Sequence, residues 1–151
     1  MPAGNWRMYG AALEAVVRGT LDLDSGSYRM VLLTSAYTPD QAAHAAWSSL
    51  SAAEVANGNG YATHGQATAL TVSRSGLVVT VDCSDETWTD ATITAKYAAV
   101  VHDADSNGAL ASGDVPLCYV DLDTGGGSIS STNAPFTIDT GEAIVLTALQ
   151  S

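Results

Sequence analysis

One loop of the sequence has the residue types and the spacing of a calcium-binding loop. Asp103, Asp105 and Asn107 offer side-chain oxygens at the first, third and fifth positions of the stretch DADSNGALASGD. Glycine follows at the sixth position, leucine stands at the eighth, and Asp114 closes the loop at the twelfth. Calcium loops need oxygen ligands at alternating positions and a glycine at the sharp turn. These four residues are therefore the candidate metal ligands, with calcium as the candidate cofactor.

The same loop departs from an EF-hand in ways that keep a plain connecting loop open as the alternative. Its last ligand position is an aspartate rather than the longer glutamate, and its ninth position is Ala111. The flanking segments have the composition of strands instead of helices. Asp, Asn, Ser and Gly are also the residues that loops between strands generally use. No other cofactor is expected.

Nothing else in the sequence has the spacing of a catalytic site. His44, His64 and His102 are far apart, and the nucleophile-elbow, phosphate-loop and zinc-protease motifs are absent from the sequence. With 16 acidic residues, a pair such as Asp121 and Asp123 is expected by chance, and its alternation predicts a solvated strand face. We therefore expect a protein that is not an enzyme.

Length and charge restrict the remaining classes of function. The chain has 151 residues, which suggests one domain spanning 1–151. Its formal net charge is −11, so a phosphate backbone or an anionic membrane surface would be repelled. No apolar run approaches the ~18 residues that a membrane span needs, and no secretory signal is recognisable. We expect a soluble protein that binds neither nucleic acid nor membrane.

The elements that would position these residues are mainly strands. Trp6, Tyr9 and Leu13 recur at helical spacing, which predicts a short N-terminal helix from a cap at Asn5 to Gly19. A second short helical segment is predicted over 41–47, after Thr38-Pro39-Asp40. The remainder predicts a jelly-roll-like antiparallel β-sandwich. The expected strands span 28–35, 67–73, 77–83, 92–102, 116–123, 134–138 and 143–149.

The remaining candidate residues are two cysteines and a set of interface anchors. Cys83 and Cys118 alternate with apolar neighbours, which predicts two thiols on core faces; a disulfide would require neighbouring strands. Tryptophan and tyrosine usually belong to the core, yet they also anchor interfaces. The candidate interface residues are Pro2, Trp6, Tyr9 and Trp47. Residues 1–5 are a candidate N-terminal arm that orders on a neighbour.

Several motifs in this order resemble the capsid cement, or decoration, proteins of tailed bacteriophages, including those of short-tailed phages. They are VLLTSAYTPD at 31–40, EV at 54–55, GNGY at 58–61, TWT at 87–89, ITA at 93–95 and AAVV at 98–101. The resemblance extends over most of the chain. It implies a jelly-roll-like fold, a homodimer, and a position on the outer capsid surface that bridges subunits of the major capsid protein. It also implies synthesis in the cytoplasm of a host bacterium.

The sequence therefore predicts a structural virion protein whose partners are the major capsid protein and a second copy of itself. No individual contact residue follows from the resemblance. A carbohydrate-binding β-sandwich on the virion surface is an alternative, which the candidate calcium loop would support. A component of the phage tail or neck is a further alternative, because tail proteins of similar size could share these motifs.

Overall fold

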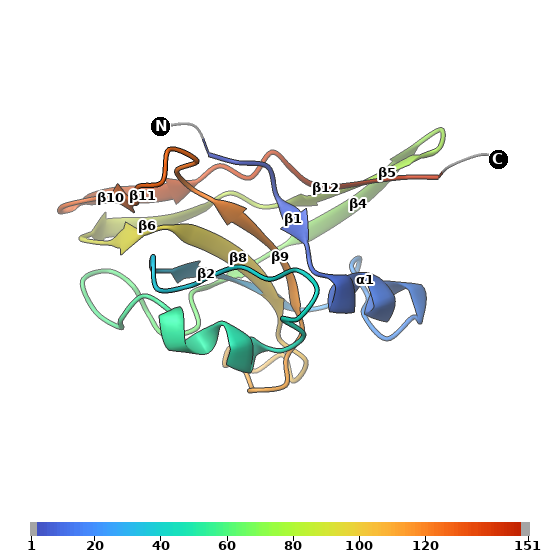
Figure 1. The fold of residues 1–151 in the computed structure, drawn as a ribbon, viewed down its shortest axis with the longest axis horizontal. Helices are drawn as coiled ribbons and strands as arrows, with labels where there is room; N and C mark the ends of the chain where they lie inside the picture. The colour runs from blue at the N-terminus through green and yellow to red at the C-terminus, as the bar shows by residue number, and fades with distance from the viewer. Residues whose placement is uncertain (1–2, 149–151) are drawn as a thin grey trace.

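Most of the chain forms antiparallel β-strands, which confirms the mainly β prediction (Figure 1). The computed structural model describes residues 3–148. The helices are α1 (Gly10–Val17) and the 3₁₀ turns η1 (Trp47–Ser49) and η2 (Ser51–Ala53). The strands are β1 (Arg7–Met8), β2 (Tyr28–Leu33), β3 (Gln66–Thr68), β4 (Leu70–Ser75), β5 (Val78–Cys83), β6 (Glu86–Ala91), β7 (Thr94–Ala95), β8 (Tyr97–His102), β9 (Pro116–Asp121), β10 (Ile129–Ser130), β11 (Ala134–Ile138) and β12 (Glu142–Thr147).

The first layer is a sheet with the strand order β1-β9-β8-β2-β3. Its inner strands β2, β8 and β9 are apolar runs such as AAVV, and nearly all of their residues are buried. A strand that alternates between buried and exposed residues covers one face of a core, whereas a continuous buried run is covered on both faces. This sheet is therefore enclosed from both sides.

The second layer is a long two-stranded ribbon (Figure 1). Strands β5, β6 and β7 follow one another along one side, and β12, β11 and β10 run antiparallel along the other. Val78 pairs with Thr147 at one end, and Ala95 pairs with Ile129 at the other. The pairing register shifts by only one residue at each bulge and otherwise continues from one pairing to the next. The three short pairings are therefore successive parts of one interrupted ribbon.

A hairpin adds β4 to one end of this ribbon. Its two-residue turn is Gly76-Leu77, and Gly76 has a φ of +60°, a left-handed conformation that favours glycine. The sequence predicts a hairpin here because the link Arg74-Ser75-Gly76 is short. In Figure 1 the β4–β5 hairpin projects from the body of the molecule, at the same end of its long axis as α1.

The long segment between β2 and β3, together with α1, covers the other face of the first sheet. Trp47 and Leu50 from the 3₁₀ turns are buried, as are Tyr9 and Ala12 at α1. They belong to the same hydrophobic cluster as the residues between the two layers. The jelly-roll connectivity stays a prediction, since the second layer is an interrupted ribbon and not a continuous sheet.

The N-terminal helix begins later than predicted. Asn5 is not its cap: the helix starts at Gly10, with Tyr9 in the capping position. The preceding residues pair with β9 instead, and the Gly4 amide donates to the Asp121 carbonyl at 2.7 Å. Hydrogen bonding to a sheet edge thus replaces the first helical turn. The predicted end is confirmed, because Gly19 follows the helix with a φ of +73°.

The helical segment predicted over 41–47 is wrong. The Asp40 carboxylate accepts bonds from the amides of Ala42 and Ala43, both at 3.0 Å, and its carbonyl accepts one from His44. These bonds stabilise one turn, after which the chain extends until η1. The strand predicted over 92–102 is interrupted at Lys96, where the chain passes from the ribbon into the first sheet. Strands β6 and β10 were not predicted.

Within residues 3–148, no helix has the length and apolar character needed to cross a bilayer.

Beneath the first sheet, two buried tyrosines share a hydrogen bond between their hydroxyl groups. The hydroxyls of Tyr9 and Tyr37 lie 2.5 Å apart, and that of Tyr37 lies 2.8 Å from His44 Nδ1. Burial raises the pKa of Tyr37 to about 12 and raises the pKa of Tyr9 further. Because the unfolded groups ionise near pH 10, we expect the free energy of unfolding to fall as the pH rises above 10.

Alkaline titration followed by both tyrosinate absorbance and circular dichroism tests this expectation. Most of the tyrosinate absorbance should appear together with the loss of β structure, because burial also raises the pKa values of Tyr28, Tyr61 and Tyr119. Ionisation of most tyrosines near pH 10, with the circular dichroism unchanged, would contradict it.

Candidate binding groove

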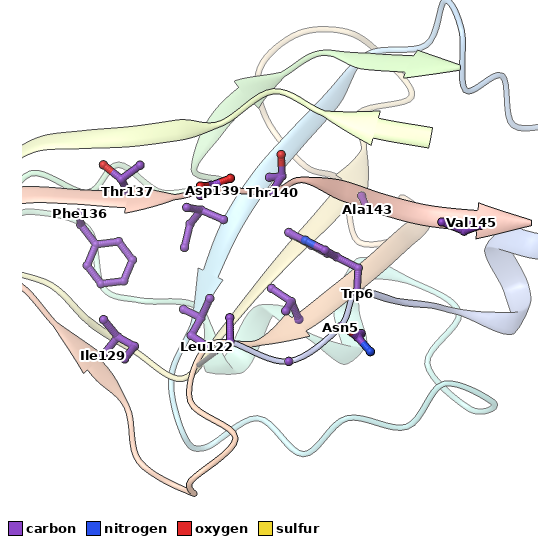
Figure 2. Close-up of a pocket in the computed structure, with 14 residues that line it drawn as sticks. Asn5, Trp6, Leu122, Ile129, Phe136, Thr137, Asp139, Thr140, Ala143 and Val145 are labelled. Carbon is purple, nitrogen blue, oxygen red and sulfur yellow. The ribbon is translucent and has the colours of Figure 1, made fainter. Parts of the chain in front are cut away.

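A groove of about 730 Å³ opens between the ribbon and the N-terminal edge of the first sheet (Figure 2). Its volume lies within the range that small-molecule and peptide side-chain sites usually have. The residues that line it come from the N-terminal segment, from the end of β9 and the loop after it, and from β10, β11 and β12. They are Ala3, Gly4, Asn5, Trp6, Val120, Leu122, Ile129, Phe136, Thr137, Ile138, Asp139, Thr140, Ala143 and Val145.

The walls of the groove are mainly apolar. Figure 2 shows the Phe136 and Ile129 side chains at one end of the groove and the Leu122 side chain beside Ile129. The half-buried Trp6 ring extends toward the bend at Thr140 and the start of β12 at Ala143. A tryptophan in this position offers a large apolar surface to a bound molecule at low cost in side-chain entropy.

The groove follows a sheet edge that is unpaired. Within the described part of the chain, β11 pairs with β6 alone and β12 pairs with β5 alone. The opposite wall is the segment 3–6, which continues β1 along β9. The groove is therefore the open side of the sandwich, where the two layers are not joined by a strand.

A polar junction fixes the bend of the ribbon above the groove. Thr140 is buried; its amide donates to Asp85 Oδ1 at 2.8 Å, and its hydroxyl donates to the Cys83 carbonyl. These bonds join the interruption between β5 and β6 to the one between β11 and β12. Thr140 is therefore a structural residue, and the neighbouring Asp139 carboxylate is the exposed polar group at the rim.

A buried lysine lies outside the groove lining, at the point where the chain passes from the ribbon into the first sheet. Lys96 is 8% exposed, and its Nζ lies 2.9 Å from Asp121 Oδ1 and 2.7 Å from the Asp123 carbonyl oxygen. The expectation that Asp121 and Asp123 form a solvated face is wrong, because Asp123 is buried and accepts a bond from the Gly125 amide. A Cβ at position 127 would lie 2.4 Å from Asp123 Oδ2, so a larger residue than Gly127 would displace this carboxylate.

A smaller hollow of about 220 Å³ lies on the other side of the N-terminal segment. It shares Gly4 and Asn5 with the groove, and Tyr97, Tyr119 and Arg7 contribute to its lining. The N-terminal segment thus forms the ridge between the two concave surfaces.

The predicted interface residues are distributed differently from the expectation. Trp6 lies in the groove, but Tyr9 and Trp47 are 0% and 3% exposed and belong to the core, so their assignment to an interface is wrong. Both rings are buried beneath the first sheet. Pro2 lies outside the described residues. Of the candidate arm 1–5, the described residues 3–5 lie along β9 of their own chain.

The candidate calcium ligands do not gather into a site. The carboxylate of Asp103 accepts the Gly108 amide at 2.8 Å, and that of Asp114 accepts the Ala111 amide at 2.8 Å. Asn107 Oδ1 accepts the Ala109 amide. In residues 3–148, no three His, Cys, Asp or Glu side chains are grouped as metal ligands. The spacing that suggested calcium serves a loop that satisfies its own amides.

The cysteines are both buried and free, as their alternation predicts. Cys83 belongs to the ribbon and Cys118 to the first sheet. Burial raises the pKa of the Cys118 thiol, and a hydrogen bond with the Cys83 thiol raises it further. The two thiols therefore meet between the layers, a pairing that the sequence could not show.

Sequence reasoning missed the groove residues Ile129, Phe136 and Val145. One signal was available: Ala143, Ile144, Val145 and Leu146 form a run in which apolar residues occupy both faces of a strand. Since β12 is an edge strand, the outward face of that run is exposed, and Val145 is 51% accessible. Apolar residues on both faces of this strand thus indicated that its outward face also contacts another apolar surface.

Comparison of the chain with models of protein families, with curated proteins and with solved structures finds no match to any of them.

The Lys96 ion pair should contribute substantially to stability. Lys96→Met would leave the Asp121 carboxylate, whose side chain is 32% exposed, without its cation. We expect a loss of about 2 kcal/mol in the free energy of unfolding, below the usual value for a fully buried pair. Arg18→Ala is the control, because Arg18 and Glu14 are 70% and 62% exposed and such pairs contribute at most about 0.5 kcal/mol. Equal effects of the two variants in urea unfolding would contradict this account.

The hydrogen bond from the Gly108 amide to the Asp103 carboxylate, within the same loop, leads to a separate prediction for Asp103. Asp103→Ala removes the acceptor of the Gly108 amide, so the free energy of unfolding should fall by about 1–2 kcal/mol. Because the carboxylate serves its own loop, this loss should be the same with calcium or with a chelator present. A calcium-dependent rise in the melting temperature of the unaltered protein would contradict the loop account and restore the metal site.

Proposed function

We propose that this protein is a non-enzymatic structural protein of a phage virion. In this role it binds the outside of the capsid as a dimer and stabilises the contacts between subunits of the major capsid protein. The observation that carries the binding role is the apolar groove along the unpaired edge of β11 and β12. The motif resemblance described above supports the phage role.

The distribution of charge supports a position on the outside of the shell. The chain carries −11, and several of its few cations are already engaged. Lys96 is in a buried ion pair, Arg29 donates to the carbonyls of His64 and Gly65, and Arg18 pairs with Glu14. Packaged DNA inside the shell would repel such a surface, whereas solvent outside the shell would not.

Binding at subunit joints would stabilise a shell without any chemical step. A protein that binds the assembled state more tightly than the separate subunits shifts the equilibrium toward assembly. Unpaired strand edges and an apolar groove are the features that such a protein needs, since both gain hydrogen bonds or apolar contacts when a neighbour covers them.

A carbohydrate-binding role is the second candidate, and one feature of the groove favours it. Trp6 offers an aromatic face, with Asn5 and Asp139 as polar neighbours in the same lining. Sugar sites combine such a ring with amide and carboxylate partners. Binding of this protein on a glycan array would support that role, and an array without binding would remove its support.

Co-sedimentation with expanded phage shells that have been stripped of this protein tests the proposed function. We expect saturable binding at a fixed ratio to the major capsid protein, and binding that Trp6→Ala weakens because Trp6 lines the groove. Leu77→Ala is the matched control, since Leu77 is 49% exposed at the hairpin turn, outside the groove.

Absence of binding to the shells would contradict the capsid role. Co-purification with tails instead would assign the protein to the tail or neck.

A further inference from the structure

We infer that the groove binds an extended segment of a partner protein, and that this segment adds to the open edge of β12 as a further strand. The segment carries apolar side chains at alternate positions, together with lysine or arginine. This inference rests on the proposed function, under which the partner is the major capsid protein. It names the contact and the chemistry of the segment that makes it.

The backbone of β12 has hydrogen-bonding groups that point away from β5. The Ala148 amide donates to the carbonyl of Leu77 directly opposite it, at 2.8 Å. In an antiparallel pair, bonded and non-bonded positions alternate along each strand. The backbone groups of Leu146 therefore point toward β5, whereas those of Val145 and Thr147 point toward the open edge. An added strand would bond to these two residues.

The groove lies where the side chains of such a strand would go. Phe136 and Ile138 point into the core, whereas Thr137 and Val145 are on the outward face, yet all four line the groove. Because residues from both faces of the ribbon line the groove, the groove must run along the edge of the ribbon. A strand added at Val145 would thus place alternate side chains into the hollow, where Trp6 and the inward residues are apolar.

Charge complementarity decides the chemistry of the segment. Of the described residues that line the groove, Asp139 alone is charged, and it is exposed at the rim. A segment with lysine or arginine would pair with this carboxylate and would be attracted by the net charge of −11. A second copy of the chain carries the same net charge, so it is a poorer occupant of this groove.

The opposite edge of the same sheet provides a matched control. The Ser84 amide donates to the Ala69 carbonyl at 2.9 Å, so by the same alternation the Val72 amide points away from β5. Val72 on β4 and Val145 on β12 are therefore both edge valines with outward amides, 36% and 51% exposed. Proline is tolerated where an edge amide faces solvent, and it removes the donor that an added strand needs.

The probe is a labelled peptide of about seven residues, the length of an ordinary strand, that alternates valine with lysine and threonine. A second peptide with glutamate in place of lysine is its control. By fluorescence anisotropy we expect saturable binding of the basic peptide to the unaltered protein and to Val72→Pro. Val145→Pro should weaken this binding at least about tenfold, and Asp139→Lys should reverse the preference between the two peptides.

Circular dichroism and melting temperature establish that each variant is folded. If Val145→Pro does not fold, the reversal by Asp139→Lys decides the inference. No binding of the basic peptide, unchanged binding by folded Val145→Pro, or equal loss in Val72→Pro would overturn it. These outcomes can be distinguished from the test of shell binding. If the protein binds shells but not the basic peptide, the strand addition alone is contradicted. If it binds the peptide but not shells, the capsid role alone is contradicted.

Discussion

The arrangement of the layers depends on how the chain passes from the ribbon into the first sheet at Lys96. The amide of Lys96 donates to the Leu33 carbonyl, and its carbonyl accepts from the Leu122 amide. Its ammonium group is buried against the Asp121 carboxylate and the Asp123 carbonyl. One residue thus joins the ends of β2 and β9 to the crossing strand. A buried ammonium is stable only with such partners, which restricts the path that the chain can take there.

The open groove is a consequence of the interrupted ribbon. Its strands bend at Ser84-Asp85 and at 139–141, where Asp85 and the buried Thr140 supply side-chain bonds in place of the sheet ladder. No described strand pairs with β11 or β12 on the groove side, although β12 approaches β1 of the first sheet. The polar junction keeps the bend in place, while Trp6 and Phe136 supply the apolar walls. A concave apolar surface beside unpaired backbone is what a binding protein presents to an extended partner.

Local patterns predicted the strands well and the site poorly, for physical reasons. The short link Arg74-Ser75-Gly76 and the alternation around Cys83 are local signals, and both were interpreted correctly. Pairing between distant segments has no local signal, so the replacement of the first helical turn by bonds to β9 was missed. The loop 103–114 shows the opposite error, because oxygen-bearing side chains at alternate positions serve their own amides as readily as a cation. The groove itself arises from several separate segments, and no spacing in the sequence could place Trp6 and Phe136 in one lining.

The central claim is that the edge of β11 and β12, with the N-terminal segment opposite it, is the surface that binds. Hydrogen–deuterium exchange of the protein, free and bound to stripped phage shells, tests this claim most directly. Amides in 137–147 and in 3–6 should exchange more slowly in the complex, because a neighbour would cover the groove and bond to its open edge. Protection confined to α1 or to the β4–β5 hairpin, with the groove segments unchanged, would contradict it.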